Sequence, residues 1–292
     1  ILVSLEKFNQ RKLRFYNLSY RHKNIEKVSL NGIKSLIAFV VCFLPIFFGF
    51  ILPFLVLLNL GYGNLDIWLN ASLILAIKNT LMVSGLAAFI TVILALLMVY
   101  GIRLSGKQLP TLILPLTTIG YAAPGAVLGI GILVPLAFLD NWLADRVFDF
   151  TGYDPGLVFT GTAFAIILAY CVRFFSIAQH TVDGALGRVS PSLPNAARSL
   201  GRNKLQVLWE IYRPLISAST ATALLLVFVD CVKELPATML LRPFNFETLA
   251  TRVHVQASLE DLPNAAPGAI LIVLIGLCAV FLLARVNQQI SH

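Results

Sequence analysis

The sequence predicts an all-α membrane protein with six transmembrane helices. Of its 292 residues, 58% are hydrophobic and only 12% are charged, and the mean hydropathy is +0.84. Soluble domains carry about 25% charged residues, so this composition excludes a water-soluble globular protein. The abundance of apolar side chains likewise excludes a disordered chain. The net charge of +8 suits either a nucleic-acid partner or positively charged membrane loops.

Six apolar stretches give the six predicted helices. A helix that crosses a hydrocarbon core of about 30 Å needs roughly 20 residues, and four stretches reach that length outright. The other two are short only because Arg173 and Asp230 interrupt them. Together the helices form one domain, 36–285, between a basic segment, 1–35, and a tail, 286–292. The predicted spans are 36–60, 80–102, 110–139, 155–177, 214–234 and 262–284.

Basic residues lie on alternate connections between these spans. They gather in 1–35, 103–109 and 179–213 and at Arg285, with Arg173 counted at the edge of its span. The positive-inside rule assigns these segments to the cytoplasm, so both termini are expected there. Because membrane topology accounts for the basic excess, no nucleic-acid partner is expected. The basic residues left for the outside are Lys78, Arg146, Lys233, Arg242 and Arg252.

The start of the chain is apolar before it becomes basic. Residues 1–5 have the sequence ILVSL, and Ile1 is an unusual first residue. One interpretation is that 1–5 ends an earlier membrane helix and that 1–35 links two halves of a longer polypeptide. The other interpretation is a trimmed start.

No pattern for resident catalytic or cofactor chemistry is found. The sequence has no G-x-x-x-x-G-K-[ST] loop, so any ATP hydrolysis must belong to a partner. The four cysteines and four histidines are scattered, without C-x-x-C or HExxH spacing, so no structural or catalytic zinc site is predicted. We therefore expect no catalytic residues in this chain.

The loop 179–213 carries the most informative pattern. Its core is PNAARSLG at 194–201, and IYRP follows nine residues later at 211–214. Pro194 suits the first turn of a short helix and Gly201 permits a sharp turn, so a helix–turn–helix is predicted. Its alanine face would either dock on a partner or rest on the bilayer surface, and the residues alone favour neither.

The spacing of this loop resembles the E-A-A-x3-G-x9-I-x-L-P motif of binding-protein-dependent ABC importer permeases. In that family the loop lies between the fourth and fifth spans, as here, and inserts into a cleft on the ATPase subunit. Asn195 stands where the motif has Glu, and Arg213 stands where it has Leu. The coupling residues implied by the resemblance are Asn195, Ala196, Ala197, Gly201, Ile211 and Pro214.

This resemblance implies the six-helix type I permease fold in the bacterial cytoplasmic (inner) membrane. The implied partners are ABC ATPase subunits that hold the ATP and Mg²⁺, a second permease half, an external solute-binding protein and the lipid bilayer. The chain itself would hold no cofactor. The alternatives are an ion-coupled secondary transporter, which needs ionisable residues near the membrane centre, and an intramembrane enzyme, which needs a catalytic cluster. The spans have few such charges and no such cluster.

A second resemblance narrows the cargo. The segments GYAAPG at 120–125 and KELPAT at 233–238 are similar to those of ferric-iron ABC permeases, which commonly consist of two fused six-helix halves. Ferric iron is therefore the cargo implied by the resemblance. Thiamine and phosphonate permeases are close relatives of that family, so these solutes stay open as alternatives.

The residues around KELPAT are candidates for the translocation pathway. Asp230 lies about 24 Å along a helix from the start of its span, near the outer side of the core. On a continuing helix Glu234 shares its face, and two carboxylates are hard donors that suit transient binding of a metal cation. The alternative is a structural network in which basic neighbours neutralise both acids. The candidates are Asp230, Lys233, Glu234, Pro236, Thr238 and Arg242, with Asp230 and Glu234 as the metal ligands.

Two further expectations concern the middle of the chain. The third span is rich in glycine and proline, which favours close helix packing, with a kink at Pro124 as the alternative. Residues 140–155 are acidic and aromatic, so they are predicted to form an external loop that meets a binding protein.

Overall fold

The computed structural model describes residues 30–63, 65–105, 117–190 and 192–290. Within these ranges the regular structure is helical throughout, and six helices are long and apolar enough to cross a membrane. The predicted fold class and number of spans are thereby confirmed. The chain divides at Leu52 into two units, which are described separately.

The N-terminal unit is an apolar helix with an irregular turn. It consists of α2 (Ile33–Ile46) and a π-helical turn, η1 (Phe47–Ile51), and α2 buries none of its side chains. The turn lies between Pro45 and Pro53, neither of which has the N–H group that the regular helix needs. An apolar helix with no buried face suits lipid or another subunit.

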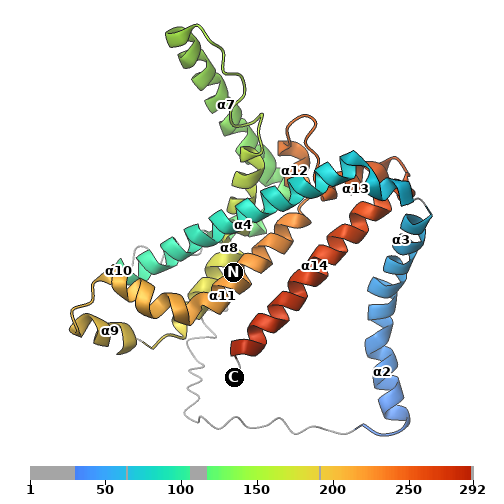
Figure 1. The fold of residues 1–292 in the computed structure, drawn as a ribbon, viewed down its shortest axis with the longest axis horizontal. Coiled ribbons are helices and arrows are strands. Elements are labelled where there is room, and N and C mark those ends of the chain that lie inside the picture. The colour runs from blue at the N-terminus through green and yellow to red at the C-terminus, as the bar shows by residue number, and fades with distance from the viewer. Residues whose placement is uncertain (1–29, 64, 106–116, 191, 291–292) are drawn as a thin grey trace, which may run out of the picture. The chain divides into compact units, whose positions relative to one another are not determined.

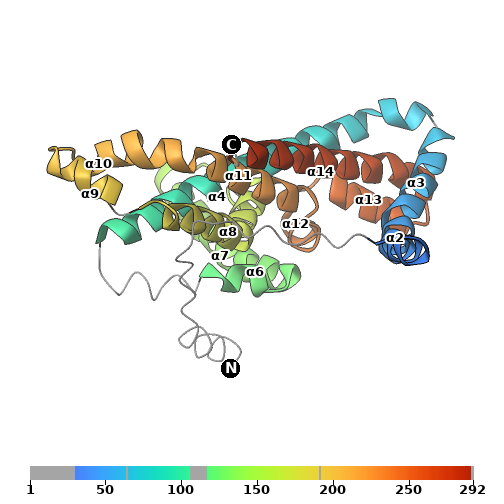
Figure 2. The same cartoon turned by 90° about the horizontal axis from the view of Figure 1, so that it is seen from below.

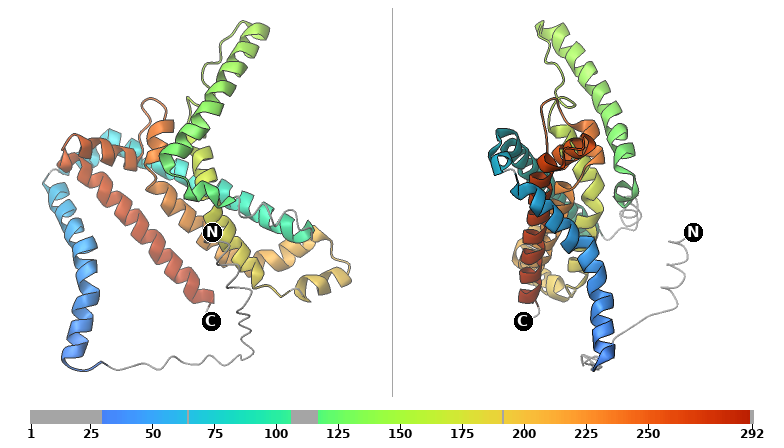
Figure 3. Two further views of the ribbon diagram at one scale, coloured as in Figure 1. Left: turned by 180° about the vertical axis from the view of Figure 1, so that it is seen from behind. Right: turned by 90° about the vertical axis from the view of Figure 1, so that its right-hand side faces the viewer.

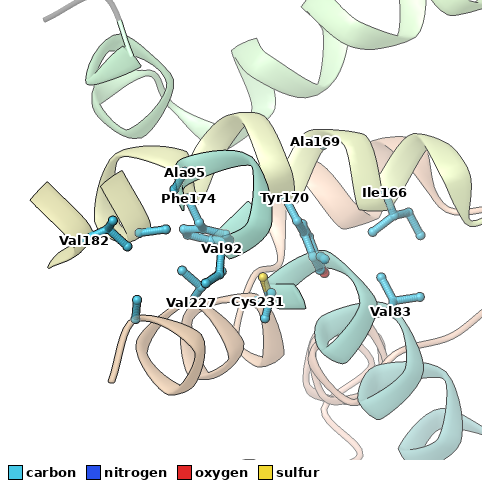
Figure 4. Packing of buried hydrophobic residues seen from close by; sticks show 14 of the residues in the cluster. Val83, Val92, Ala95, Ile166, Ala169, Tyr170, Phe174, Val182, Val227 and Cys231 are labelled. Carbon is cyan, nitrogen blue, oxygen red and sulfur yellow. The ribbon is translucent and has the colours of Figure 1, made fainter. Parts of the chain in front are cut away.

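Three helices of the second unit form its core. They are α4 (Ala71–Ser105), α8 (Phe164–Gly187) and α11 (Arg213–Val232). Val92, Phe174 and Val227 point toward one another from these helices (Figure 4). Fully buried alanines let the helices approach closely, which is how helices associate where lipid supplies no hydrophobic driving force. These alanines are Ala87 and Ala95 on α4, Ala165, Ala169 and Ala178 on α8, and Ala223 on α11.

Further helices complete this unit. The span ahead of α4 ends in α3 (Leu52–Tyr62) and a 3-10 turn, η2 (Leu65–Leu69). After α11 come α12 (Pro236–Leu241) and α13 (Leu249–Ser258), and the last span is α14 (Leu262–Ile290). Figures 1 and 2 show α14 beside α11, with α13 at the end of α14 near α12.

The third span differs most from its prediction. Residues 110–116 of that predicted span lie outside the described ranges, and the chain forms a short helix, α6 (Ile119–Ala122), before α7 (Gly125–Thr151). Ala123 and Pro124 are extended between them, as expected before and at a proline. The helix is therefore interrupted at Pro124, where a kink was predicted. Packing at glycine also occurs, because a Cβ on Gly129 would lie only 3.1 Å from Leu240 Cδ1 of α12.

The external loop predicted at 140–155 is wrong over most of its length. Helix α7 continues through Asp140 to Thr151 and ends at Gly152, whose φ of 69° suits glycine. Its far half projects away from the core helices (Figure 3). Asp140 is buried and fixes the returning chain, since its carboxylate accepts backbone hydrogen bonds from 158–160 at 2.7–3.0 Å. The sequence alone does not reveal that an acidic residue ties this hairpin together.

Candidate functional site

The loop between the fourth and fifth spans is a helix–turn–helix, as predicted. Helix α9 (Ser192–Ser199) is followed by α10 (Lys204–Val207), and a π-helical turn, η3 (Leu208–Tyr212), leads into α11. Gly201 ends α9 with a φ of 83°, in the left-handed region that favours glycine. The Gly201 N–H donates to Arg198 O, and the Arg202 N–H donates to Ala197 O, both at 3.0 Å. These two bonds form a Schellman cap.

The second helix is capped at its start. The Asn203 side chain accepts the Gln206 N–H at 2.8 Å, and the Gln206 side chain accepts the Asn203 N–H at 2.9 Å. This reciprocal pair is a capping box, which satisfies two N–H groups at the helix start. The turn is therefore defined on both sides, so the loop presents a fixed shape.

The predicted coupling residues fall into two groups. Asn195 and Ala196 are exposed on α9, whereas Ala197 is buried. Ile211 and Pro214 lie beyond α10, in the turn and helix that lead into the membrane domain. Several large apolar side chains of the same region are exposed, which suits either a partner protein or the bilayer surface. They are Leu193, Leu200, Leu205 and Trp209.

This helix–turn–helix is tied to the core helices. The Tyr100 hydroxyl of α4 donates to Lys204 O at 2.5 Å, and the Tyr100 ring packs edge-on against Tyr212, with 5.6 Å between centroids. At the end of α8, Arg188 donates to Ser219 of α11 at 3.0 Å. A displacement of α10 would therefore be carried to α4 through Tyr100 and to α11 through η3, while Arg188 joins α8 to α11.

A second cluster lies at the other end of α11. Arg173, in the middle of α8, places its Nε 3.2 Å from Glu234 Oε2. The Glu234 side chain is 7% exposed, and its Oε1 accepts the Ala237 N–H at 3.1 Å. Arg173 also donates to Ala123 O at 3.2 Å, at the break before α7. One buried ion pair thus joins α8, the start of α12 and the α6–α7 break.

The start of α7 fits closely against this pair. A Cβ on Gly125 would lie 2.7 Å from Arg173 Nη1 and 2.8 Å from Glu234 Oε1, so only glycine leaves room there. One turn along α8, the Tyr170 hydroxyl lies 2.6 Å from the Thr238 hydroxyl, which donates to Glu234 O at 2.9 Å. The GYAAPG and KELPAT segments therefore meet at one point.

The other predicted pathway residues are also paired. Lys233 Nζ lies 2.7 Å from Asp230 Oδ1, as expected if basic neighbours neutralise the acids. Arg242 lies 3.8 Å from Glu247 Oε1 and is paired with neither Asp230 nor Glu234. Among the described residues, no group of three or more His, Cys, Asp or Glu side chains is placed to hold a metal ion. The geometry thus favours the structural network over a preformed cation site.

Two expectations about this cluster need correction. Helix α11 ends at Val232, so Asp230 and Glu234 are not on one continuing helix. The cause is Pro236, because proline has no N–H to donate to the carbonyl four residues earlier, at Val232, and instead begins α12. Arg173 was assigned to the cytoplasmic edge, yet it lies beside the opposite end of α11. The sequence did hold a sign of this pairing: Arg173 interrupts an apolar run, and a charge within a membrane span requires a partner.

Six candidate membrane helices, with a capped turn ahead of the fifth, define a multi-pass membrane protein. Residues 89–292 match the family model described as "Binding-protein-dependent transport system inner membrane component". The chain belongs to this family and is a multi-pass protein of the bacterial inner membrane. Membership favours the importer interpretation over the secondary transporter and the intramembrane enzyme.

Among curated relatives, the chain is 30% identical over 210 residues to Fe(3+)-transport system permease protein FbpB 2 of Haemophilus influenzae. The match covers 72% of this chain and 38% of that protein. It is 28% identical over 174 residues to the putative 2-aminoethylphosphonate transport system permease protein PhnV of Salmonella typhimurium, covering 59% of this chain and 58% of that one. The chain thus spans about two fifths of the ferric relative's length.

The fold is also similar to that of a solved transporter. A chain of the bacterial alginate ABC transporter, crystallised in complex with an alginate pentasaccharide-bound periplasmic protein, superposes with a TM-score of 0.60. The match covers 84% of this chain and 92% of that chain, at 17% sequence identity. The likeness is one of fold.

Proposed function

We propose that this chain is a membrane-spanning half of an ATP-driven importer that moves ferric iron from an external binding protein into the cytoplasm. The observation that carries the proposal is the relationship to ferric permeases, which reaches 30% identity. The segments that first suggested ferric permeases, GYAAPG and KELPAT, meet at the buried Arg173–Glu234 pair. They therefore belong to one structural unit of the membrane domain.

In this proposal α9, α10 and both termini face the cytoplasm, and the domain has the type I permease arrangement. The basic residues of the helix–turn–helix, among them Arg198, Arg202 and Lys204, support this orientation through the positive-inside rule. Asn195, Ala196 and the exposed apolar side chains near them would contact the ATPase, which holds the ATP and Mg²⁺. A second permease half, fused or separate, would complete the pathway.

The proposed mechanism is alternating access driven from the cytoplasmic side. Closure of the ATPases would push α9 and α10, and the Tyr100 contact and the η3 turn would pass the movement to α4 and α11. At the far end of α11, Asp230, Lys233, Glu234, Pro236, Thr238 and Arg242 would border the pathway. Any contact of iron with Asp230 or Glu234 would be transient, because both carboxylates are paired and a permeation path must release its cargo.

The cargo is tested by uptake in iron-starved cells with and without the gene for this chain. We expect radiolabelled iron(III) uptake to be lost on deletion and restored by the wild-type gene, while thiamine and 2-aminoethylphosphonate uptake persist. Unchanged iron uptake would contradict the ferric proposal. Loss of either other solute alone would reassign the cargo.

A further inference from the structure

A cavity of about 530 Å³ lies between the start of α4 and the segment that joins α12 to α13. Its volume is in the range of small-molecule sites, roughly 300–1,000 Å³. Its lining combines apolar with polar and charged side chains. The apolar lining is Leu75, Ala76, Met239, Pro243 and Phe244, and the polar lining is Ser72, Arg242, Asn245 and Glu247.

Positive charges outnumber negative charges around this cavity. Arg242 Nη1 lies 3.8 Å from Glu247 Oε1, and Arg252 Nη1 lies 3.8 Å from Glu247 Oε2. Both distances exceed the roughly 2.7–2.9 Å of a hydrogen bond between charged groups. One carboxylate therefore faces two guanidinium groups without a direct hydrogen bond to either. The group of three carries one net positive charge.

Arg252 places a second positive charge behind the cavity lining. Its side chain is 7% exposed, and its Nη1 donates at 2.7 Å to the hydroxyl of Ser72, which lines the cavity. Its Nε is buried and makes no hydrogen bond within the described part of the chain. A buried charged donor without an acceptor is costly, so this arginine is one acceptor short.

We infer that this cavity binds a small oxyanion through Arg242, with Arg252 supplying charge behind Ser72. A guanidinium has a planar array of donors that matches a phosphate, phosphonate or carboxylate group. The Asn245 side chain offers further donors. Glu247 acts as the counter-ion of Arg242 when no anion is bound. Its side chain is 36% exposed, so it has room to turn away when an anion enters.

This oxyanion site requires neither a ferric cargo nor the ATPase. Only one acidic side chain lines the cavity, which does not suit a metal cation, whereas two arginines suit an anion. The phosphate group bound there would come from a free solute or from a lipid headgroup. Both sources share the same chemistry, and binding measurements distinguish them.

The test measures binding of two probes to the full chain, purified from membranes in an uncharged detergent with its bound subunits. The probes are inorganic phosphate and dihexanoyl phosphatidylglycerol, followed by calorimetry or by a ligand-dependent rise in melting temperature. Loss of a charged hydrogen-bond donor in Arg242→Gln is expected to weaken binding about ten-fold or more. Glu247→Gln is expected to strengthen it several-fold, because a competing negative charge is removed.

The opposite directions of these two effects separate an anion site from a structural ion-pair network. Arg146→Gln, at an arginine that stacks on Trp142 of α7, is the matched control and leaves binding unchanged. If Arg242→Gln does not fold, Arg242→Lys keeps the charge and loses the planar donors, so weaker binding is again expected. A response to phosphate assigns a free solute, and a response to the lipid alone assigns a headgroup. Binding of neither probe, or the same affinity in both variants, would overturn the inference.

Discussion

Glu234→Ala is expected to lower the free energy of unfolding by about 3–5 kcal/mol, because it leaves a buried arginine without its counter-charge. Arg173 is the affected partner, at 3.2 Å, and the Ala237 N–H loses its acceptor as well. The measurement is unfolding of the purified protein in mixed micelles with increasing SDS, followed by tryptophan fluorescence.

Two further variants show whether the loss comes from the pair. Asp230→Ala removes an ion pair whose lysine is mostly exposed, so a loss of at most about 1 kcal/mol is expected. The double variant Arg173→Met with Glu234→Leu removes both charges and is expected to recover much of the loss of Glu234→Ala. Equal losses for Asp230→Ala and Glu234→Ala would contradict the structural importance of the Arg173–Glu234 pair.

Gly201→Val is expected to abolish most ATP-driven transport while the membrane domain stays folded. Its φ of 83° costs a residue with a side chain about 1–2 kcal/mol, so the cap of α9 should open and the helix–turn–helix lose its shape. The measurement is iron uptake, together with the amount of ATPase that co-purifies with the chain. Both should fall, whereas the level of the chain in membranes should not.

Gly184→Ala is the matched control for this change. Gly184 is exposed on α8, and a Cβ there meets no atom within 4 Å. Because alanine is the better helix former, transport and co-purification should be unchanged. Wild-type transport by Gly201→Val would show that the fixed turn is not needed for coupling.

The fold could be predicted largely from composition and from the lengths of the apolar runs. A span of lipid-facing helix is specified locally, since about 20 apolar residues suffice to define it. The helix–turn–helix was predictable for the same reason, because Pro194 and Gly201 act on their own neighbours. Helix α7 was not, because polar residues past Asp140 resemble a loop although the helix continues through them.

The buried cluster could not be assembled from spacing alone. Arg173 and Glu234 belong to different helices, and nothing local in the sequence shows which turn of α8 faces the end of α11. The same holds for Gly125, whose importance appears only when two charged side chains are found against its Cα hydrogens. The carboxylates of Asp230 and Glu234 suggested metal ligands, but each pairs with a basic residue of the same chain.

The account depends most on the claim that α9 docks on the ATPase. A photo-cross-linking residue placed at Ala196, which is exposed on α9, tests this claim directly in native membranes. The control position is Phe150, exposed at the far end of α7, away from α9 (Figures 1 and 3). We predict that position 196 cross-links to an ABC ATPase subunit and that position 150 does not. Absence of the ATPase from the products at 196, or its appearance at 150, would contradict the account.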